Sequence, residues 1–488
     1  MDKTAIAVLI TIFVYLAVMV VIGILYSKKN KSADDFYLGG RKLGPLVTAM
    51  SAEASDMSSW LLMGLPGVAY LTGIAEAFWT ALGLAIGTWV NWLVVSKRIR
   101  RYSQKIDAIT IPDFFSKRYK DTKNLLSFVA ALVILVFFIP YTASGFAACG
   151  KLFKSLFNVD YHQAMIICAV IIVVYTTLGG FIAASTTDFI QSIIMTIALV
   201  VVLGFGTAKA GGFGEVVDNA KNLAGYLSLK DVFSPVTGTS ASYGGVLAIV
   251  STLAWGLGYF GMPHILLRFM AARDEKKLTL SRRVATVWVV ISMGLSIVIG
   301  MVGLGMTKAG VRPSLQGANS ETVIVEIANV LRSNGVLPAI VAGLILAGIL
   351  AATMSTADSQ LLAASSSVSQ NLVTDFFKIK MSNKVSVIVA RATVVVISII
   401  AVFLAWNPDS SVFKIVSFAW AGFGAAFGPV MLLALFWKRS NMAGALAGMV
   451  TGGVMVFLWK YVISKLGGAF AIYELLPAFV LALIVNIV

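Results

Sequence analysis

The segment from Pro45 to Gly67 has the length of a membrane-spanning helix, but its centre is polar. The residues from Ser51 to Ser59 read SAEASDMSS, with two carboxylates and four hydroxyls. A charged side chain at the centre of a bilayer costs about 2.5–3.5 kcal/mol on insertion scales, so it persists mainly where it faces a cavity or a partner. The pattern therefore predicts a helix that breaks in mid-membrane around a polar or charged ligand, which is how secondary transporters build ion and substrate sites.

The composition supports a polytopic membrane protein. Of 488 residues, 59% are hydrophobic and only 12% are charged, and a soluble chain of this size could not bury so much apolar surface. The net charge of +16 does not indicate a nucleic-acid partner, because the basic residues fall in short loops between apolar runs. The cysteines, Cys149 and Cys168, form neither a metal-binding pattern nor a disulfide framework.

Apolar runs of about 20 residues mark the expected membrane spans. We count thirteen of them, at residues 5–27, 45–70, 74–96, 125–149, 161–179, 186–208, 244–269, 285–307, 337–370, 386–405, 412–437, 442–463 and 469–488.

Lysine and arginine are concentrated in the loops after spans 1, 3, 7, 9 and 11, which all lie on one side. The loop after span 1 holds Lys28, Lys29, Lys31, Arg41 and Lys42. Because cytoplasmic loops carry the excess of basic residues, the pattern predicts an N-terminus outside and a C-terminus in the cytoplasm.

A second interrupted span runs over residues 244–269. Its centre, from Trp255 to Pro263, reads WGLGYFGMP, and three glycines and a proline strongly weaken a helix interior. This span lies five after the first interrupted one, so the two cross the membrane in opposite directions. Paired interruptions of this kind indicate inverted repeats around a transport site. The expected division is 1–44 for the first span and its loop, 45–210 for the first repeat, 211–243 for an extracellular loop, 244–440 for the second repeat and 441–488 for accessory spans.

Span 9 offers oxygen ligands next to this break. Ala352, Ser355, Thr356 and Ser359 are spaced so that they share one helical face, with Asp358 at its edge. Hydroxyl oxygens suit hard cations. The same residue types also hold membrane helices together, which is the alternative interpretation.

Three further carboxylates, Asp56, Glu53 and Asp188, lie in or near the predicted spans. Asp56 could bind an ion, or it could cap the second half-helix or hold a neighbouring span. Glu53 is expected one turn nearer the cytoplasm, in a wet vestibule. Asp188 could complement the dipole of the helix it begins, or belong to an ion exit path or a second ion site.

Aromatic residues predict a small substrate pocket. Trp255 and Tyr259 are four residues apart and share a face, and Trp60 and Tyr141 could complete the walls. Ordinary aromatic packing is the alternative. We expect no Lys or Arg in mid-span near the breaks, so a substrate carboxylate would rely on half-helix N–H groups or a bound cation. No nucleotide-binding or hydrolytic motif is present in the sequence, which favours a transporter driven by an ion gradient over an enzyme.

With these residues in place, the chain resembles the solute:sodium symporter family, and within it the bacterial sodium/proline symporters. The stretches that carry the resemblance are Tyr37–Arg41, Ala54–Ser58, Trp60–Pro66, Trp255–His264 and Ala419–Pro429.

The resemblance implies an all-α membrane protein of about thirteen transmembrane helices, with a LeuT-like core of two inverted five-helix repeats and discontinuous spans 2 and 7. It implies sodium-coupled import of L-proline by alternating access across a bacterial inner membrane, without a cofactor or an obligate protein partner. The implied sodium ligands are the carbonyls of Ala54, Met57 and Ala352 and the hydroxyls of Ser355 and Thr356. The implied proline contacts are Ser58, Trp60, Tyr141, Trp255, Tyr259 and Pro263. The implied coupling residues are Asp56, Asp188 and Arg41, and relatives with a second sodium site use positions matching Asp188, Asp358 and Ser359.

Departures from the family pattern put the ion stoichiometry in question. Glu53 and Ser59 stand where glycine is usual, and Asp358 replaces a hydroxyl. The added carboxylates suggest a different number of ions or coupling to a proton. Our hypothesis is that Asp188 and Asp358 lie within about 10 Å of each other around a second cation.

Two alternatives remain at this stage. One keeps the mechanism and changes the solute to another small amino acid or carboxylate, coupled to sodium or protons. The other is a sensor derived from a transporter, which would need a cytoplasmic signalling domain that the sequence up to Val488 does not contain.

Overall fold

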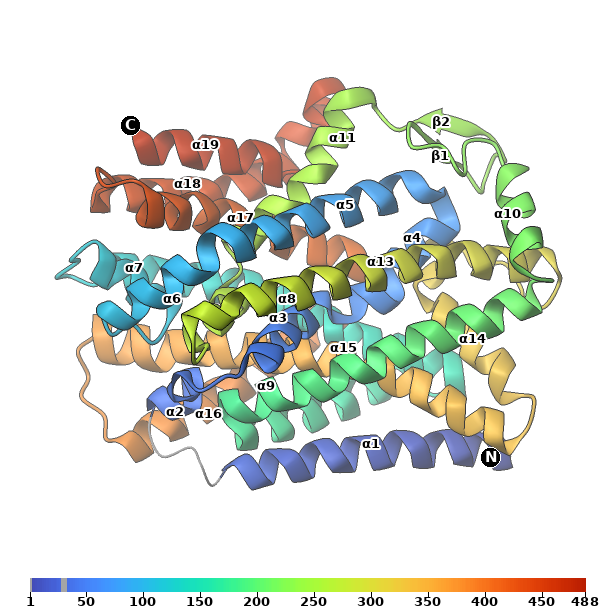
Figure 1. Cartoon of the computed structure of the whole chain (residues 1–488), viewed down its shortest axis with the longest axis horizontal. Coiled ribbons are helices and arrows are strands. Elements are labelled where there is room, and N and C mark those ends of the chain that lie inside the picture. Colours follow the sequence, from blue (N-terminus) through green and yellow to red (C-terminus); the bar gives the residue numbers. More distant parts are fainter. Residues whose placement is uncertain (1, 28–32) are drawn as a thin grey trace.

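The computed structural model in Figure 1 is a bundle of helices that run mostly along the long axis of the molecule. The structure describes residues 2–27 and 33–488. Lys28, Lys29 and Lys31, which contribute to the predicted orientation, lie outside the described residues.

The α-helices of the described part are α1 (Lys3–Ser27), α2 (Ala33–Leu38), α3 (Pro45–Ser59), α4 (Leu65–Thr72), α5 (Ile74–Val90), α6 (Ser96–Lys105), α7 (Ile111–Arg118), α8 (Leu125–Phe157), α9 (Tyr161–Lys209), α10 (Phe213–Lys221), α11 (Gly245–Leu253), α12 (Pro263–Ala271), α13 (Leu278–Lys308), α14 (Val323–Arg332), α15 (Val336–Ser366), α16 (Asn383–Leu404), α17 (Val412–Phe436), α18 (Met442–Tyr461) and α19 (Leu475–Ile487). Shorter 3₁₀ or π segments include η1 (Gly39–Arg41), η2 (Trp60–Gly64), η3 (Asn91–Val95), η4 (Ala254–Phe260) and η6 (Gly317–Thr322). The strands β1 (Asp231–Phe233) and β2 (Ser240–Ser242) pair antiparallel, with Asp231 opposite Ser242.

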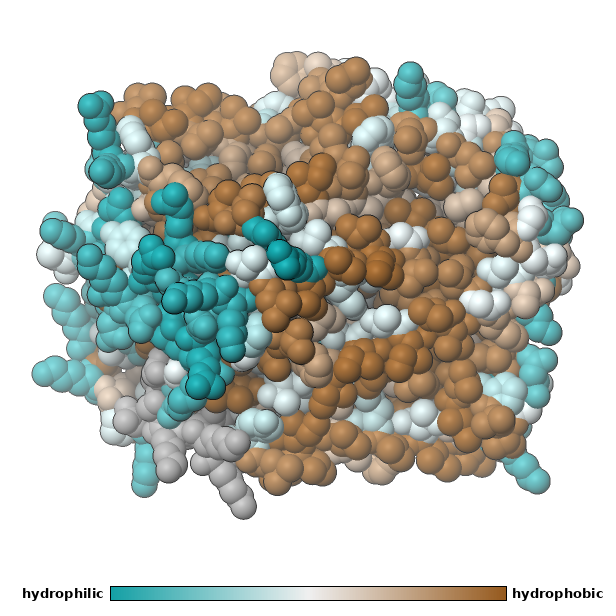
Figure 2. Space-filling view, viewed as in Figure 1, coloured by the Kyte–Doolittle hydropathy of each residue, from teal (hydrophilic) through white to brown (hydrophobic). Residues whose placement is uncertain are grey.

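The surface has the pattern of a protein that crosses a membrane several times. Figure 2 shows a broad hydrophobic belt between two hydrophilic ends. Within the described residues, nine helices are long and apolar enough to span a bilayer, or ten when Gly245–Phe260 and Pro263–Ala271 count as one span. The chain is therefore a multi-pass membrane protein, and the count of thirteen spans stays a prediction.

Helix α9 contains a non-helical residue. It is 49 residues long, and a straight helix of that length would measure roughly 74 Å at 1.5 Å per residue, well beyond the hydrocarbon thickness of about 30 Å. Gly180 has φ 67° and ψ −173°. This conformation suits glycine, which has no Cβ to clash.

The polar run lies in α3, and the helical backbone is interrupted there. Ser58 has φ 40° and ψ −170°, and the chain continues through η2 into α4. A second interruption separates η4 from α12, where the axis bends by 44°. Pro263 is well placed at the first turn of α12, because its missing N–H has no partner to lose there.

A close approach of α17 explains one of the glycines in η4. A Cβ built at Gly258 would lie 1.9 Å from Nε1 of Trp420, which donates a hydrogen bond to the carbonyl oxygen of Trp255 at 2.7 Å. Only glycine leaves room for this indole. The interrupted segment is thus held against α17 by packing and by a hydrogen bond.

Candidate functional site

Helix α15 faces the interrupted part of α3 and hydrogen-bonds to it. The Ser355 hydroxyl donates to the carbonyl oxygen of Ala54 at 2.8 Å. The hydroxyls of Ser355 and Thr356 are also both 3.1 Å from the carbonyl oxygen of Ala352. Four of the five expected sodium ligands therefore form one buried set of oxygens. Hydroxyls can turn their lone pairs toward a cation, so the set can exchange internal hydrogen bonds for ion ligation.

The fifth expected ligand, Met57, lies at the break itself. Its carbonyl oxygen accepts the backbone N–H of Trp60, and the same N–H is 3.2 Å from the Ser58 hydroxyl. These contacts close the turn that follows the non-helical Ser58. The structure does not join Met57 to the other four residues by a hydrogen bond within the described residues.

Asp56 links the interrupted helix to two tyrosines. Its carboxylate accepts the Tyr259 hydroxyl at 2.5 Å, and its backbone carbonyl accepts the Tyr141 hydroxyl at 3.1 Å. Both tyrosines are almost fully buried. The side chain of Asp56 is thus a connection between α3 and η4, and its other oxygen has no partner in the described part of the chain.

The other expected substrate residues lie in or next to the two interrupted segments. The rings of Trp60 and Trp255 lie 6.0 Å apart, and Tyr259 packs edge-on against Trp420. Pro263 is buried at the start of α12. A narrow cavity of about 10 Å³ lies beside the break and is lined by Ser58, Ser59, Tyr141, Thr142, Ser144, Gly145, Thr353, Thr356, Ala357 and Gln360. Ser59, which the family pattern did not explain, is therefore a lining residue of this cavity.

A larger cavity of about 570 Å³ lies between α4, η6 and α17. Phe413 and Gly64 are among its lining residues. The Phe413 ring contacts Trp60 and Trp255, with centroids 6.4 and 5.6 Å away. Phe413 therefore stands between this cavity and the tryptophans of the expected substrate site.

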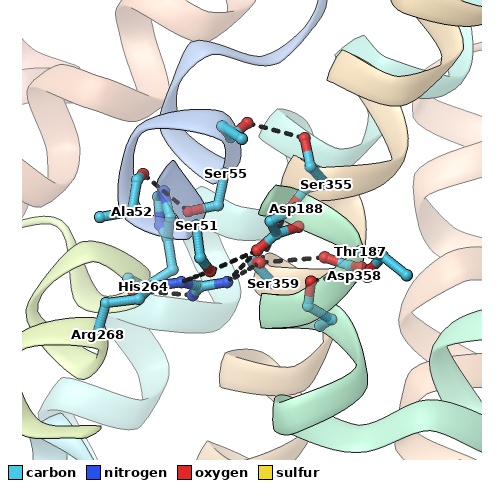
Figure 3. A network of polar contacts seen from close by, with 12 residues as sticks. Ser51, Ala52, Ser55, Thr187, Asp188, His264, Arg268, Ser355, Asp358 and Ser359 are labelled. Atoms are coloured by element: carbon cyan, nitrogen blue, oxygen red, sulfur yellow. Dashed lines mark hydrogen bonds and ion pairs between the residues drawn. The ribbon is translucent and has the colours of Figure 1, made fainter. Parts of the chain in front are cut away.

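Arg268 is the centre of a second buried polar network, shown in Figure 3. Its guanidinium donates to the Ser51 hydroxyl at 3.0 Å, to the Asp188 carboxylate at 3.1 Å and to the Ser359 hydroxyl. The Ser51 hydroxyl also donates to Asp188 at 2.6 Å. Arg268 is only 1% exposed. The network ties α3, α9, α12 and α15 together.

The expectation that no basic residue lies near the breaks was wrong. Arg268 follows Pro263 by five residues, at the end of an apolar run, where hydropathy gives no sign that it points inward. Arg268 donates hydrogen bonds to Asp188 and Ser359, two of the three residues that the resemblance assigned to a second sodium site. The Ser359 hydroxyl is in turn 3.0 Å from Asp358, so contacts of no more than 3.1 Å connect Asp188 to Asp358 through Arg268. Arg268 is therefore bonded directly to Asp188, and to Asp358 through the Ser359 hydroxyl.

Glu53 does not lie in a wet vestibule, which corrects a second expectation. It is 1% exposed and accepts the indole N–H of Trp92 at 2.9 Å. Trp92 is in η3, directly after α5. Trp92 is 39 residues from Glu53 in the chain, and a sequence pattern on α3 alone carries no information about this contact.

Arg41 lies away from the site and joins three segments near the basic end of the molecule. It donates to the carbonyl oxygen of Met270 at 2.9 Å, to the Ser103 hydroxyl at 3.1 Å and to the carbonyl oxygen of Ala108 at 2.6 Å. It therefore connects η1 with the end of α12, with α6 and with the α6–α7 loop. A shift of α12 would therefore disturb the hydrogen bond from Arg41 to the Met270 carbonyl.

A protein-family model matches most of the chain. The model described as "Sodium:solute symporter family" matches residues 36–452. The chain belongs to the sodium:solute symporter family. This confirms the resemblance drawn from the motifs, and it makes the chain a transporter and not an enzyme.

Curated relatives of this symporter cover nearly its whole length. The osmoregulated proline transporter OpuE of Bacillus subtilis (strain 168) is 41% identical over 99% of this chain and 94% of its own length. The sodium/proline symporter of Escherichia coli (strain K12) is 41% identical over 97% of this chain and 90% of its own. The high-affinity proline transporter PutP of Bacillus subtilis (strain 168) is 41% identical over 96% and 94%.

Solved structures share the symporter's fold. A Na⁺-coupled sialic acid symporter in a substrate-bound outward-open state has a TM-score of 0.77 at 19% identity, covering 98% of this chain and 96% of the other. MHP1, a nucleobase-cation-symport-1 family transporter in a closed conformation, has a TM-score of 0.53 at 14% identity, covering 92% and 93%. These likenesses confirm the all-helical transporter fold class.

Proposed function

We propose that this symporter imports L-proline together with sodium by alternating access. The observation that carries the proposal is the buried oxygen set at the interrupted helix, in which Ser355 of α15 hydrogen-bonds to the Ala54 carbonyl. Relatives about 41% identical over nearly the full length are named proline transporters or sodium/proline symporters. Sodium is the coupling ion, and no other cofactor enters the mechanism.

Asp56 connects the proposed sodium ligands with the proposed proline pocket. Sodium would take the carbonyls of Ala54, Met57 and Ala352 and the hydroxyls of Ser355 and Thr356, and so fix the turn at Ser58. Two residues before that turn, Asp56 holds Tyr259 and Tyr141. An ion that orders this segment also orders the aromatic walls of the proline pocket. The coupling is reciprocal, so proline must also raise sodium affinity.

The proline pocket combines aromatic walls with few polar groups, which suits a small ring-shaped amino acid. We assign its contacts to Ser58, Trp60, Tyr141, Trp255, Tyr259 and Pro263. Proline's carboxylate would use backbone N–H groups freed at the break or the bound sodium. Arg268 is not available to it, because its donors are engaged by Ser51, His264, Asp188 and Ser359.

We further propose that the protein lies in a bacterial inner membrane with its N-terminus outside and its C-terminus in the cytoplasm. A dense hydrophilic surface at one end of the hydrophobic belt supports this orientation (Figure 2). Arg100, Arg101 and Lys105 belong to the helix α6 at that end. Lipid and substrate are the partners that this function requires.

The test is uptake of labelled L-proline by the purified full chain in liposomes. We expect an inward sodium gradient to drive accumulation, and an equal potassium gradient not to do so. Unlabelled L-proline should compete, whereas other small amino acids and carboxylates should not at equal concentration. Equal competition by another solute would contradict the assignment of proline as the specific substrate. Accumulation without sodium would contradict sodium coupling.

A further inference from the structure

We propose that Ser59 and Gln360 form a further substrate-binding subsite, which takes one carboxylate oxygen of the transported amino acid. The inference rests on the proposed function and deepens it, because it assigns side chains to one group of the substrate. Neither residue is among the expected sodium ligands or the expected proline contacts. The subsite is the narrow cavity of about 10 Å³ beside the break in α3.

The first support is a pair of buried polar side chains that line the same cavity without hydrogen-bond partners. Ser59 is fully buried, and Gln360 is 1% exposed. The Ser59 hydroxyl and Nε2 of Gln360 have no partner among the described residues. A buried donor without an acceptor is costly, so two such groups on one cavity indicate a ligand that both can bind. They come from different elements, Ser59 from α3 and Gln360 from α15.

Hydrogen bonds within the protein determine which atoms of the cavity remain free. The Thr142 hydroxyl donates to Oε1 of Gln360 at 2.9 Å, which leaves the two N–H bonds of the Gln360 amide unused. The other polar side chains that line the cavity already have partners, namely Ser58, Tyr141, Ser144, Thr353 and Thr356. Ser59 and Gln360 therefore supply the free donors.

These donors suit an oxygen of an anion. A hydroxyl and an amide N–H can both donate to one carboxylate oxygen, and hydrogen bonds to a charged acceptor are stronger than those between neutral groups. The described residues that line the cavity include no Asp or Glu, so no carboxylate of the lining repels a substrate carboxylate. The Asp56 carboxylate lies outside the lining and accepts the Tyr259 hydroxyl of η4.

The size of the cavity limits what can enter it. A water-sized group needs about 10–15 Å³ by this measure, and the cavity measures about 10 Å³. It therefore has room for one oxygen atom and not for a ring. The pyrrolidine ring of proline would stay at the aromatic walls, and the second carboxylate oxygen would stay available to the backbone N–H groups of the break.

The cavity also adjoins both of the sites that the proposed function couples. Thr356 lines it from the sodium ligands, and Ser58 and Tyr141 line it from the proline contacts. Gln360 follows Thr356 by four residues, so the two side chains share a face of α15. A carboxylate oxygen bound here would lie beside the sodium ligands, where the attraction between ion and carboxylate is only weakly screened. This attraction would contribute directly to the coupling of sodium and substrate.

The first test measures binding to the purified full chain in saturating sodium. Ser59→Ala removes a hydroxyl with little change in volume, and Gln360→Leu removes the amide. Each should raise the Kd for L-proline at least tenfold, because the carboxylate loses a donor. Gln163→Leu, in the exposed first turn of α9, is the matched control for Gln360→Leu and should bind proline like the wild type.

A second measurement separates substrate contact from a purely structural role. Sodium alone should raise the melting temperature of the wild type and of both variants with the same concentration midpoint, within about twofold, because neither residue is a sodium ligand. A structural role would weaken sodium and proline binding together. Equal loss of both affinities in Ser59→Ala and Gln360→Leu would therefore overturn the inference.

Solid-state NMR tests the contact itself. L-Proline labelled with ¹³C in its carboxylate is bound to the full chain, in which the glutamine side-chain amides carry ¹⁵N. The wild type should show a dipolar coupling between the two labels at hydrogen-bond range. The coupling should disappear in Gln360→Leu at a proline concentration that saturates this variant, and it should persist in Gln163→Leu.

The outcomes distinguish this inference from the proposed function. Unchanged proline binding in both Ser59→Ala and Gln360→Leu would overturn the inference and leave the function intact. A saturated wild type without the coupling would do the same, because the cavity would then hold water and not the carboxylate. Absence of sodium-dependent proline binding in the wild type would overturn the proposed function. The same measurements with the carboxylate that binds in place of proline would then decide the role of Ser59 and Gln360.

Discussion

Asp56 has the central position among the individual residues of the site. It is buried, yet it makes different bonds with its side chain and its backbone, one to Tyr259 and one to Tyr141. Hydrogen bonds to a charged group contribute about 1.5–3 kcal/mol, whereas those between neutral groups contribute about 0.5–1.5 kcal/mol. The two tyrosines should therefore contribute unequally to the coupling between sodium and proline.

We expect Tyr259→Phe to weaken proline affinity by about tenfold or more, because it leaves the Asp56 carboxylate without its donor. Tyr141→Phe is the matched control, since it removes the same hydroxyl from a bond to a backbone carbonyl. Its effect should be several-fold smaller. The Km for proline at saturating sodium is the measurement, and equal or reversed effects would contradict the role assigned to the Asp56 side chain.

At the scale of elements, α12 contributes a cation that binds α3, α9 and α15 together. The polar run could be recognised from the sequence because carboxylates at bilayer depth are rare, and Ala54, Ser355 and Thr356 could be carried over from family motifs. The role of Arg268 could not be predicted from the sequence, because Arg268 ends an apolar run and its partners Asp188 and Ser51 lie 80 and 217 residues away. The surroundings of Glu53 could not be predicted from the sequence either, since its partner Trp92 is 39 residues away on a different helix.

We expect Arg268→Gln to lower the melting temperature and to make it dependent on sodium. Removing one partner of a buried ion pair costs about 3–5 kcal/mol, because the other charge stays buried. Sodium entering beside Asp188 would recover part of this loss and make the sodium dependence of uptake sigmoidal. The double variant Arg268→Gln with Asp188→Asn should melt closer to the wild type in sodium-free buffer.

The matched control for Arg268 is Arg101→Gln, which breaks an ion pair with Glu275 on the surface. Exposed pairs contribute about 0–1 kcal/mol, so its melting temperature should barely change. An Arg268→Gln protein that melts like the wild type, with or without sodium, would show that the guanidinium does not balance Asp188.

At the scale of the whole molecule, the proposed coupling of sodium to proline depends on one buried contact between the two interrupted regions and α15. The oxygen set at Ala54, Ala352, Ser355 and Thr356 lies at the α3–α15 contact. The aromatic walls belong to η2, η4 and α8. Because Asp56 is two residues from Ala54 and accepts the Tyr259 hydroxyl, we expect ion and substrate affinities to depend on each other. This linkage is the central claim, and it concerns equilibrium binding as well as transport.

The most direct test is binding of labelled L-proline to the purified protein over a range of sodium concentrations. The wild type should bind proline at least tenfold more tightly in saturating sodium than in potassium, a coupling of about 1.4 kcal/mol. In the variant Ser355→Ala with Thr356→Ala, the midpoint of the sodium dependence should rise at least tenfold, with proline affinity recovered at high sodium. Proline binding of equal strength in sodium and potassium, or a sodium midpoint unchanged in this variant, would contradict the account.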